Sequence, residues 1–304
     1  MKITPDFVAV DWGTSRVRAW AMDGDGAVIG EASAADGMGT LAPEEFEPAL
    51  EKLIADWLPG KGKLPIIACG MVGARGGWIE APYVEVPASP PDAENAIEAP
   101  VRSLPVSMRI LPGMCQRNPA DVMRGEETQI AGLLARIPDY EGIVCLPGTH
   151  TKWVSIADGK VVGFQTFMTG ELFSLLSTRS VLRLSVNSDD FCQSSFEEGV
   201  ALALNRPEQV FAQLFSLRAE SLLAGLSAAR AKGRLSGLLI GLEVVATKDM
   251  CAQNNIVIVG TETLSGLYEQ AISTQGKFVC RITAEELVIA GLYAAYAHFR
   301  GTCS

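Results

Sequence analysis

The feature that most constrains the fold of this chain is an internal repeat. When the sequence is shifted by 135 positions, Gly13-Thr14 falls on Gly148-Thr149 and Asp23-Gly24 falls on Asp158-Gly159. Both pairs of dipeptides lie between short apolar runs, and the first apolar runs of the two copies coincide as well. Glycine and aspartate at such places are typical of tight turns between strands. The repeat therefore predicts two related strand–turn–strand–turn–strand units.

Strands and helices are expected to alternate along the rest of the chain. The expected strands cover residues 6–11, 16–22, 26–33, 65–69, 256–259 and 277–282, besides those of the second copy of the repeat at 142–167. The expected helices cover residues 43–58, 126–136, 170–184, 189–203, 208–230, 234–252, 262–274 and 284–299. Pro207 and Gly233 are expected to separate helices, and the Pro- and Ala-rich segment 86–105 is expected to form a loop.

This alternation indicates an α/β protein with a mixed sheet and flanking helices in each of two lobes. The length favours two lobes as well, because single hydrophobic cores stop growing at roughly 250–300 residues. The N-terminal lobe is expected over residues 1–138, completed by the C-terminal helix 284–304, and the C-terminal lobe over residues 139–283.

The composition argues against several functional classes. Hydrophobic residues make up 48% of the chain and charged residues 20%, so a substantial core is expected. The net charge of −10 argues against nucleic acid or an anionic membrane surface as a partner. No apolar run approaches the roughly 20 residues that span a bilayer, and the scattered cysteines are typical of reduced thiols in a cytoplasmic protein. With His150 and His298 as the only histidines, a metal site of several histidines is excluded.

The first turn of the repeat carries residues suited to phosphate. Asp11 ends the first strand, and Gly13, Thr14 and Ser15 follow it. Successive backbone N–H groups in such a turn form an anion cradle, in which glycine permits close approach and hydroxyls add donors. A carboxylate beside the cradle would repel phosphate unless Mg²⁺ lay between them, which makes Asp11 a candidate metal ligand. The turn alone leaves open a second interpretation, in which Asp11 and Gly13 only shape a hairpin.

Two later turns have a related character. The matching turn of the second copy contains Gly148-Thr149, His150 and Lys152, and the lysine would add positive charge to a two-turn polyphosphate site. Gly260-Thr261 joins a buried strand to a helix, and such a junction suits a nucleoside packed against glycine backbone and the helix N-terminus. The three turns together predict a site for a nucleotide.

Longer motifs resemble one known family. They are VDWGTS (10–15), GMVGARGGW (70–78), APYV (81–84), MRGEETQ (123–129), LPGTHTKW (146–153) and FMTGELF (167–173). Together they resemble the 2-dehydro-3-deoxygalactonokinase family, within the superfamily of sugar kinases, Hsp70 and actin. The resemblance implies a duplicated, two-lobed ribonuclease H-like fold. It also implies transfer of phosphate from ATP, with Mg²⁺, to the terminal (6-) hydroxyl of 2-dehydro-3-deoxy-D-galactonate in galactonate catabolism.

Phosphoryl transfer to a hydroxyl usually needs a carboxylate that accepts the proton. Glu126 follows a glycine at the start of an expected helix, near the place where related sugar kinases carry an acidic base. Asp121 is the next candidate. An acidic residue in a first helical turn can also serve only to complement the helix dipole, and the sequence leaves that alternative open for Glu126.

A sugar acid also carries a carboxylate that must be paired. Arg75, in the glycine-rich loop, is the leading candidate for a bidentate clamp, with Arg16, Arg18 and Arg124 as further candidates. Met71 and Trp78 of the same loop are assigned to the substrate site with it. A loop arginine that is merely solvated is the alternative.

Two other functional classes stay open on the sequence. One is a phosphohydrolase of polyphosphate or guanosine polyphosphate, in which the Gly-Glu-Glu segment would supply the catalytic acid. The other is a nucleotide-driven switch of the actin or chaperone kind. The oligomeric state is open as well, a homodimer included.

Overall fold

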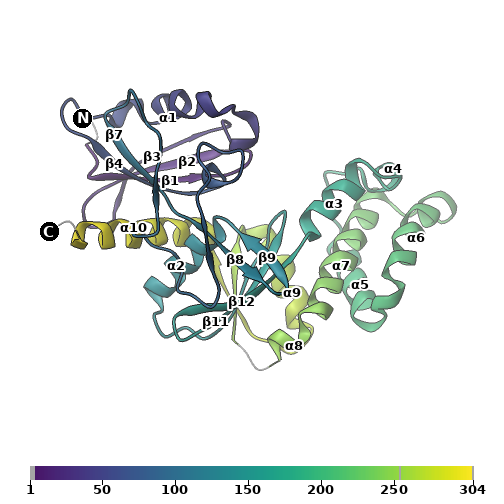
Figure 1. Cartoon of the computed structure of the whole chain (residues 1–304). Coiled ribbons are helices and arrows are strands. Elements are labelled where there is room, and N and C mark those ends of the chain that lie inside the picture. Colours follow the sequence, from purple (N-terminus) through teal and green to yellow (C-terminus); the bar gives the residue numbers. More distant parts are fainter. Residues whose placement is uncertain (1–3, 253–254, 303–304) are drawn as a thin grey trace. The chain divides into compact units, whose positions relative to one another are not determined.

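The computed structural model describes residues 4–252 and 255–302, and it divides into two compact units (Figure 1). Unit 1 comprises residues 4–140, 156–163 and 284–302. Unit 2 comprises residues 141–155 and 164–283. The sequence placed the whole segment 139–283 in one lobe, whereas the hairpin tip at 156–163 belongs to unit 1, where Val161 bridges to Ala88.

Unit 1 is built on a six-stranded mixed sheet with the strand order β3-β2-β1-β4-β7-β6. Its strands are β1 (Phe7–Trp12), β2 (Val17–Met22), β3 (Val28–Ala34), β4 (Leu64–Gly70), β6 (Ile97–Glu98) and β7 (Val106–Ile110). Strands β1, β2 and β3 are antiparallel neighbours, while β4 and β7 continue the sheet parallel to β1. A separate small sheet contains β5 (Tyr83–Glu85), β8 (Gly113–Arg117) and β9 (Ala120–Met123).

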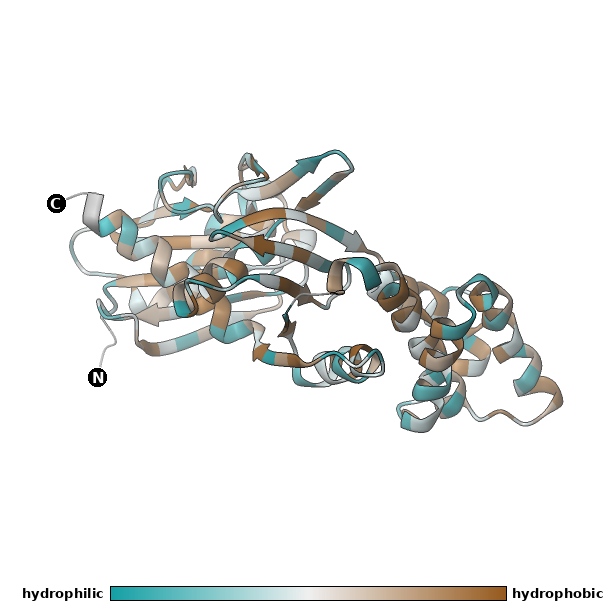
Figure 2. Cartoon of the chain, turned by 90° about the horizontal axis from the view of Figure 1, so that it is seen from below, coloured by the Kyte–Doolittle hydropathy of each residue, from teal (hydrophilic) through white to brown (hydrophobic). Residues whose placement is uncertain are grey.

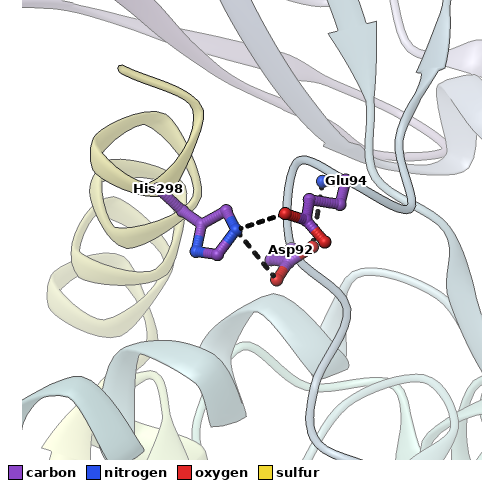
Figure 3. Close-up of side chains that lie close together, drawn as sticks. All are labelled: Asp92, Glu94 and His298. Atoms are coloured by element: carbon purple, nitrogen blue, oxygen red, sulfur yellow. Dashed lines mark hydrogen bonds and ion pairs between the residues drawn. The ribbon is translucent and has the colours of Figure 1, made fainter. Parts of the chain in front are cut away.

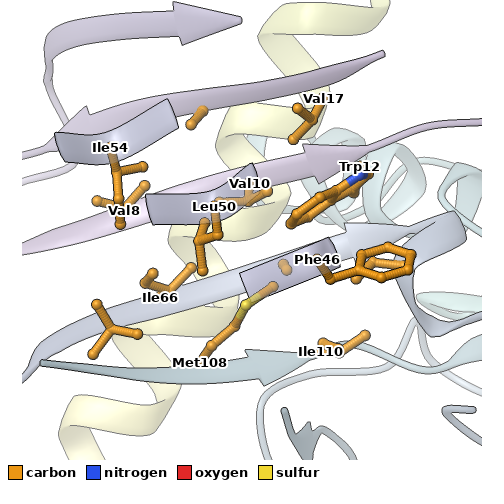
Figure 4. Packing of buried hydrophobic residues seen from close by; sticks show 14 of the residues in the cluster. Val8, Val10, Trp12, Val17, Phe46, Leu50, Ile54, Ile66, Met108 and Ile110 are labelled. Carbon is orange, nitrogen blue, oxygen red and sulfur yellow. The ribbon is translucent and has the colours of Figure 1, made fainter. Parts of the chain in front are cut away.

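The central strand β1 is buried on both faces. Alternate residues of a strand point to opposite faces, so Val8, Val10 and Trp12 pack beneath helix α1 (Phe46–Ile54) (Figure 4). The other set of side chains, with Phe7 stacked on Tyr296 at a centroid distance of 3.8 Å, packs on helix α10 (Ala284–Thr302). A strand covered by helices on both faces holds its C-terminal end in a fixed place, and Asp11 lies at that end.

Helix α10 also crosses helix α2 (Glu126–Arg136) at backbone contact. A Cβ on Gly132 of α2 would lie 2.0 Å from the carbonyl oxygen of Leu287, and one on Gly291 of α10 would lie 2.0 Å from that of Thr128. Only glycine permits such a close approach of two helices. The C-terminal helix therefore locates the first turn of α2, where Glu126 lies.

Unit 2 repeats the strand order of unit 1, with β12-β11-β10-β13-β14. Its strands are β10 (Gly142–Leu146), β11 (Thr151–Ala157), β12 (Lys160–Phe167), β13 (Ile256–Gly260) and β14 (Val279–Thr283), with β13 parallel to both β10 and β14. In both sheets the third, second and first strands are followed by two further strands, β4 and β7 in unit 1 and β13 and β14 in unit 2, and unit 1 adds β6 at the edge. The predicted α/β class and duplicated ribonuclease H-like architecture are confirmed.

A group of helices is inserted between the strands of unit 2. They are α3 (Thr169–Thr178), α4 (Arg183–Val186), α5 (Gln193–Asn205), α6 (Val210–Leu223), α7 (Ala228–Ala246) and α8 (Lys248–Cys251), followed after β13 by α9 (Glu262–Ser273). Hydrophobic residues recur along these helices as well as along the strands (Figure 2). No helix in the described part of the chain is long and apolar enough to cross a membrane.

The predicted helix over 208–230 was wrong in its C-terminal part. The chain leaves the helix after Leu223, where Gly225 adopts a φ of +67°, and α7 then begins at Ala228. Gly233 does not end a helix but lies inside α7. A Cβ at this position would lie 2.3 Å from the carbonyl oxygen of Cys192, just before α5, so glycine allows the two segments to pack closely. Strands β5, β7, β8 and β9 were missed, and segment 86–105, expected as loop, contains the short strand β6.

Candidate active site

Asp11 is held in an ion pair at the end of β1. In the β1–β2 register it lies opposite Arg18, and the Arg18 Nη2 lies 2.6 Å from its Oδ2. The other terminal nitrogen of Arg18 lies 3.0 Å from Oε2 of Glu285 on α10. The Asp11 side chain is 20% exposed. A guanidinium therefore lies against the carboxylate that the sequence assigned to Mg²⁺.

Two glycines bring the start of α2 beside Asp11. Gly70 ends β4 with a φ of +90°, and a Cβ on it would lie 3.3 Å from Asp11 Oδ1. Gly125, the N-cap residue of α2, has a φ of +107°, and a Cβ there would lie 3.5 Å from the Cα of Gly70. The sequence-predicted residues Asp11 and Glu126 therefore belong to one region of unit 1, at the carboxyl ends of β1 and β4.

Glu126 and Glu127 both bind backbone N–H groups at the start of α2. An oxygen of Glu126 accepts a hydrogen bond from the Arg124 N–H at 3.0 Å, and both oxygens of Glu127 lie within 2.9 Å of the Gly125 nitrogen. Glu127 is buried, and burial together with the charge of Glu126 raises its pKa to about 8. Glu127 was not among the residues predicted from the sequence. Its position three residues before buried Ile130 places it on the inner face of the helix, and this spacing was the signal that could have identified it.

Glu127 is expected to make stability fall with rising pH. Its pKa is raised in the folded state, so the stabilisation is complete below the ordinary value of 4.5 and is lost as pH rises through about 8. Glutamine at this position does not titrate. Between pH 4.5 and 8 the free energy of unfolding of wild type should therefore fall by about 3–5 kcal/mol more than that of Glu127→Gln. Urea unfolding of both proteins across this range measures the difference. Glu80→Gln, at an exposed position, is the control, and parallel curves for wild type and Glu127→Gln would contradict the assignment.

The substrate candidates of the glycine-rich loop have different surroundings. Arg75 is exposed and has no hydrogen bond or ion pair to any described residue. Met71 is half-buried, whereas Trp78 packs between Trp12 and Phe46 and is 9% exposed. Packing in the α1 core accounts for most of the Trp78 surface. Of the loop residues named, Arg75 has a side chain free to meet a solute.

Two other sequence candidates, Arg124 and Asp121, lie just before α2. The Arg124 guanidinium stacks on Tyr83 at 4.3 Å and donates to the Ala81 carbonyl at 2.8 Å. Its Nε and Nη1 are buried with no hydrogen-bond partner among the described residues, which is costly for a cationic donor. Asp121 lies on β9, where its Oδ1 accepts from the Val122 N–H.

In the first predicted phosphate turn, one amide is already engaged. The Gly13 N–H donates to the carbonyl oxygen of Arg16 at 2.8 Å. The carbonyls of Gly13 and Thr14 accept from Met38 and Gly39, so the turn rests on the loop that follows β3. Thr14 and Ser15 are exposed, and their amides have no acceptor among the described residues. The donors available to an anion are therefore those of Thr14 and Ser15.

The second predicted phosphate turn is held by the start of α3. The Glu171 N–H donates to the Thr149 carbonyl at 2.9 Å, and the Glu171 carboxylate lies 2.6 Å from His150 Nε2. A Cβ on Gly170 would lie 2.2 Å from the Gly148 carbonyl oxygen, so glycine is required there. His150 and Thr149 are exposed, whereas Lys152 is 5% exposed on β11.

A buried carboxylate, which sequence analysis did not identify, lies beneath this turn. Glu243 of α7 accepts hydrogen bonds from the Trp153 indole at 2.6 Å, from the Tyr268 hydroxyl at 2.9 Å and from the Thr169 hydroxyl. Tyr268 also meets the Thr151 hydroxyl at 2.9 Å. Burial raises the pKa of Glu243 to about 7. The network joins β11, α3, α7 and α9, which surround the second turn and the cavity beside it.

That cavity has a volume of about 730 Å³ and lies entirely within unit 2. Much of its wall is apolar, including Phe173, Phe191, Leu239, Leu264 and Leu267. Its polar wall comes from the second phosphate turn and from α3, α7, α9 and β14, and includes Gly148, Thr169, Lys232, Ser236, Glu262 and Arg281. A mostly apolar concavity of this size with a few polar groups is typical of a small-molecule site.

The predicted Gly260-Thr261 turn leads into the wall of this cavity. Thr261 is the N-cap residue of α9, and the cavity is lined by the first turns of that helix, from Glu262 to Tyr268. A Cβ on Gly260 would lie 2.9 Å from the Ser265 hydroxyl, which is buried with no partner among the described residues. The second and third predicted turns thus meet at one cavity.

Among the residues that the structure describes, one group of His, Asp and Glu side chains has the spacing of a metal site. It consists of Asp92, Glu94 and His298, whose ligand atoms lie within 4.8 Å of one another (Figure 3). Glu94 and His298 are exposed, and the hydrogen bond to Glu94 and the charge of Asp92 raise the pKa of His298. This geometry is that of a surface ion pair, and Asp11 is not part of it.

Comparison with known proteins identifies relatives over nearly the whole chain. The family described as 2-keto-3-deoxy-galactonokinase matches residues 11–295. A Rhizobium meliloti protein named probable 2-dehydro-3-deoxygalactonokinase is 43% identical over 95% of this chain and 96% of its own length. The 2-dehydro-3-deoxygalactonokinase of Escherichia coli is 34% identical over 95% of this chain and 97% of its own. A crystal structure of a Sinorhizobium meliloti protein assigned to the same kinase superposes with a TM-score of 0.90 at 42% identity, over 96% of this chain and 99% of that one.

Proposed function

The chain belongs to the 2-keto-3-deoxy-galactonokinase family, and from this premise we propose that it transfers the γ-phosphate of ATP to the 6-hydroxyl of 2-dehydro-3-deoxy-D-galactonate. Family membership makes it a phosphotransferase. The structural observation that carries the proposal is the cavity of unit 2, because two of the three predicted nucleotide turns meet at its wall.

We assign the nucleoside of ATP to this cavity. Its apolar side chains suit a purine ring, and the N-terminal end of α9 offers unpaired N–H groups and the positive end of a helix dipole. Lys232 and Arg281 are cationic residues of the wall, although Arg281 already pairs with Glu262 and Glu269. In unit 2 we assign phosphate binding to the Gly148-Thr149 turn, and in unit 1 to the amides of Thr14 and Ser15.

The role assigned to Asp11 is to hold Mg²⁺, because its carboxylate lies at the end of β1 beside the first predicted phosphate turn. The carboxylate already pairs with the Arg18 guanidinium at 2.6 Å, so Mg²⁺ would share it with that cation or displace it. Mg²⁺ in kinases is commonly bound through one or two carboxylates together with phosphate oxygens and water. When bound, the metal would neutralise charge on the transferring phosphate.

We assign the role of general base to Glu126. It is half-buried and lies in the region of Asp11, whereas Glu127 is buried. Its carboxylate would accept the proton of the 6-hydroxyl as the oxygen attacks the γ-phosphorus. Glu127 is the supporting residue, because its carboxylate holds the Gly125 N–H and so orients the first turn of α2.

Arg75 is the assigned partner of the sugar-acid carboxylate. Its exposed side chain has no described partner to give up, and an arginine can bind a carboxylate through two parallel hydrogen bonds. Arg75→Ala should raise the KM for the sugar acid about 10- to 100-fold, the loss of one charge-assisted contact, with little change in the KM for ATP. Steady-state kinetics with each substrate varied in turn measures both values. Arg117→Ala, an exposed arginine paired with Glu85, is the control, and equal effects on both substrates would count against the clamp.

The function itself is tested by ADP release from Mg-ATP with and without 2-dehydro-3-deoxy-D-galactonate. We expect ADP release to depend on the sugar acid, and we expect the product to carry one phosphate ester at the terminal carbon. Phosphate release that does not need the sugar acid would favour a phosphohydrolase instead. A panel of 2-keto-3-deoxy sugar acids epimeric at single carbons identifies the preferred substrate.

A further inference from the structure

The Glu243 carboxylate, near the end of α7, connects three other elements of unit 2. It accepts hydrogen bonds from the Trp153 indole at 2.6 Å, from the Tyr268 hydroxyl at 2.9 Å and from the Thr169 hydroxyl. Trp153 lies on β11, Thr169 is the first residue of α3, and Tyr268 lies in the second turn of α9. Glu243 itself is 2% exposed and is not part of the wall of the cavity assigned to the nucleoside.

The carboxylate also fixes the direction of these hydrogen bonds. An ionised carboxylate only accepts, and each hydroxyl has a single proton to donate. Because Tyr268 donates its proton to Glu243, the Thr151 hydroxyl, 2.9 Å away, must donate to Tyr268. Thr151 is the first residue of β11 and directly follows the second phosphate turn. A directed chain of hydrogen bonds therefore runs from the end of that turn through α9 to Glu243.

Hydrogen bonds alone stabilise the charge of Glu243. No lysine or arginine in the described part of the chain forms an ion pair with it. Burying a carboxylate without a cation costs free energy, whereas an apolar side chain of similar size would pack at this place without that cost. A buried network in which every donor and acceptor is satisfied fixes the positions of its members. The contribution of Glu243 is therefore to position its donors, and not to stabilise the fold.

The bond to Thr169 bears on the second phosphate turn. Thr169 begins the helical turn in which the Glu171 N–H donates to the Thr149 carbonyl at 2.9 Å. Packing holds Thr169 only weakly, because it lines two cavities, the one of about 730 Å³ and a second of about 350 Å³. A side chain beside empty space lacks contacts on that side. The hydrogen bond to Glu243 thus determines where α3 begins and where it holds the turn.

The bond to Tyr268 bears on the wall assigned to the nucleoside. Tyr268 lines the cavity of about 730 Å³, as do Leu264 and Leu267 earlier in α9. Its hydroxyl is held by both Glu243 and Thr151, which fixes the rotation of α9 about its own axis. A displaced Tyr268 would carry the apolar side chains of α9 with it, because they belong to one rigid helix.

We propose that Glu243 is a positioning residue for ATP. It contacts neither substrate, and it holds the second phosphate turn, through Thr169, and the nucleoside wall, through Tyr268, in the relative placement that one ATP molecule requires. This inference rests on the proposed function, because it takes the cavity of unit 2 as the nucleotide site. The residues assigned to the sugar acid belong to unit 1, so the effect of Glu243 should be confined to ATP.

The first test is Glu243→Gln, which keeps the size of the side chain. The amide has one acceptor, which the Trp153 N–H requires, so its own N–H groups face the two hydroxyls and reverse their bonds. We expect the Kd for Mg-ATP to rise about 10- to 100-fold, the loss of hydrogen bonds to a charged group. The kcat at saturating ATP and the KM for the sugar acid should change less than about twofold. Calorimetric titration and steady-state kinetics at pH 8 measure these values, because the pKa of Glu243 is about 7.

Leu238→Ala is the matched control on the same helix. Leu238 is buried against Ala203 and Val210, on α5 and α6, and takes no part in the network. Its truncation should lower the melting temperature and leave the Kd for Mg-ATP unchanged. Unchanged ATP affinity in Glu243→Gln, or equal increases in both KM values, would overturn the proposal. A wild-type protein that binds no ATP would overturn the proposed function as well, so the two failures are distinguishable.

A second test does not depend on the folding of a Glu243 variant. Tyr268→Phe and Thr169→Val each remove one hydroxyl and keep the shape of the side chain, so each should raise the Kd for Mg-ATP about 3- to 10-fold. Because both residues act through the same carboxylate, the double variant should be weakened by less than the product of the two factors. Tyr296→Phe, which removes a hydroxyl from α10 in unit 1, should bind ATP as wild type does. Effects that multiply in full, or single variants with wild-type affinity, would show that the network does not position ATP.

Discussion

Glu126→Gln is expected to lower kcat by about 10²- to 10⁴-fold, the usual contribution of a general base, while the KM for ATP stays within about twofold. Glutamine keeps the shape of the side chain and can still accept the hydrogen bond from the Arg124 N–H, so the start of α2 should keep its conformation. What is lost is the ability to take the proton of the sugar hydroxyl. Single-turnover measurement of phosphoryl transfer, with ATP affinity measured separately, checks both parts.

Two neighbouring carboxylates serve as matched controls for Glu126. Glu127→Gln should retain most of kcat, because the proposed role of Glu127 is to hold the Gly125 N–H and its amide oxygen can still accept that bond. Asp121→Asn should also be active, since Asp121 binds the backbone of its own strand. An active Glu126→Gln together with an inactive Glu127→Gln would transfer the role of base to Glu127. Loss of activity in Asp121→Asn alone would transfer it to Asp121.

Asp11→Asn is the second substitution with a large expected effect. Removing the negative charge should lower kcat about 100-fold or more and raise the Mg²⁺ concentration needed for half-maximal activity, since a neutral amide binds Mg²⁺ poorly. Stability should change little. The lost ion pair with Arg18 is partly exposed, and such pairs contribute about 0–1 kcal/mol. Activity titrated with Mg²⁺, together with thermal unfolding, separates the two effects.

The control for Asp11 is Asp23→Asn in the next turn. The carboxylate of Asp23 accepts hydrogen bonds from the amides of Asp25 and Ala27, which an asparagine side chain can also accept. We expect full activity and ordinary Mg²⁺ dependence. If Asp11→Asn instead lowers the melting temperature strongly while the Mg²⁺ requirement is unchanged, Asp11 serves to hold Arg18 in the sheet, and the metal assignment fails.

Much of the fold could be predicted because it depends on local patterns. Paired turn dipeptides at a constant offset revealed both strand–turn–strand units, and helix 126–136 was placed at its observed bounds. Errors arose where distant packing overrode a local signal. Gly233 looked like a helix end, but it lies inside α7, where the Cys192 carbonyl before α5 approaches so closely that no side chain would fit.

The candidate site shows the same division between local and distant information. The turns at 13–15, 148–152 and 260–261 were visible as sequence motifs, since each contains its donors within a few residues. Glu243 was not, because its three donors come from Trp153, Thr169 and Tyr268, on three other elements. No local pattern distinguishes a glutamate that ends in such a network from one that faces solvent.

The sequence by itself determined that this chain forms two related α/β units, because strand periodicity and turn residues act over a few positions. Its motifs also determined the family to which it belongs. Only the tertiary structure decided which charged groups meet. Strand register places Arg18 against Asp11, helix rotation buries Glu127 and leaves Glu126 half-exposed, and the packing of α7 with β11, α3 and α9 gives Glu243 its three donors. Those outcomes depend on contacts between residues far apart in the chain, where burial and register set the electrostatics.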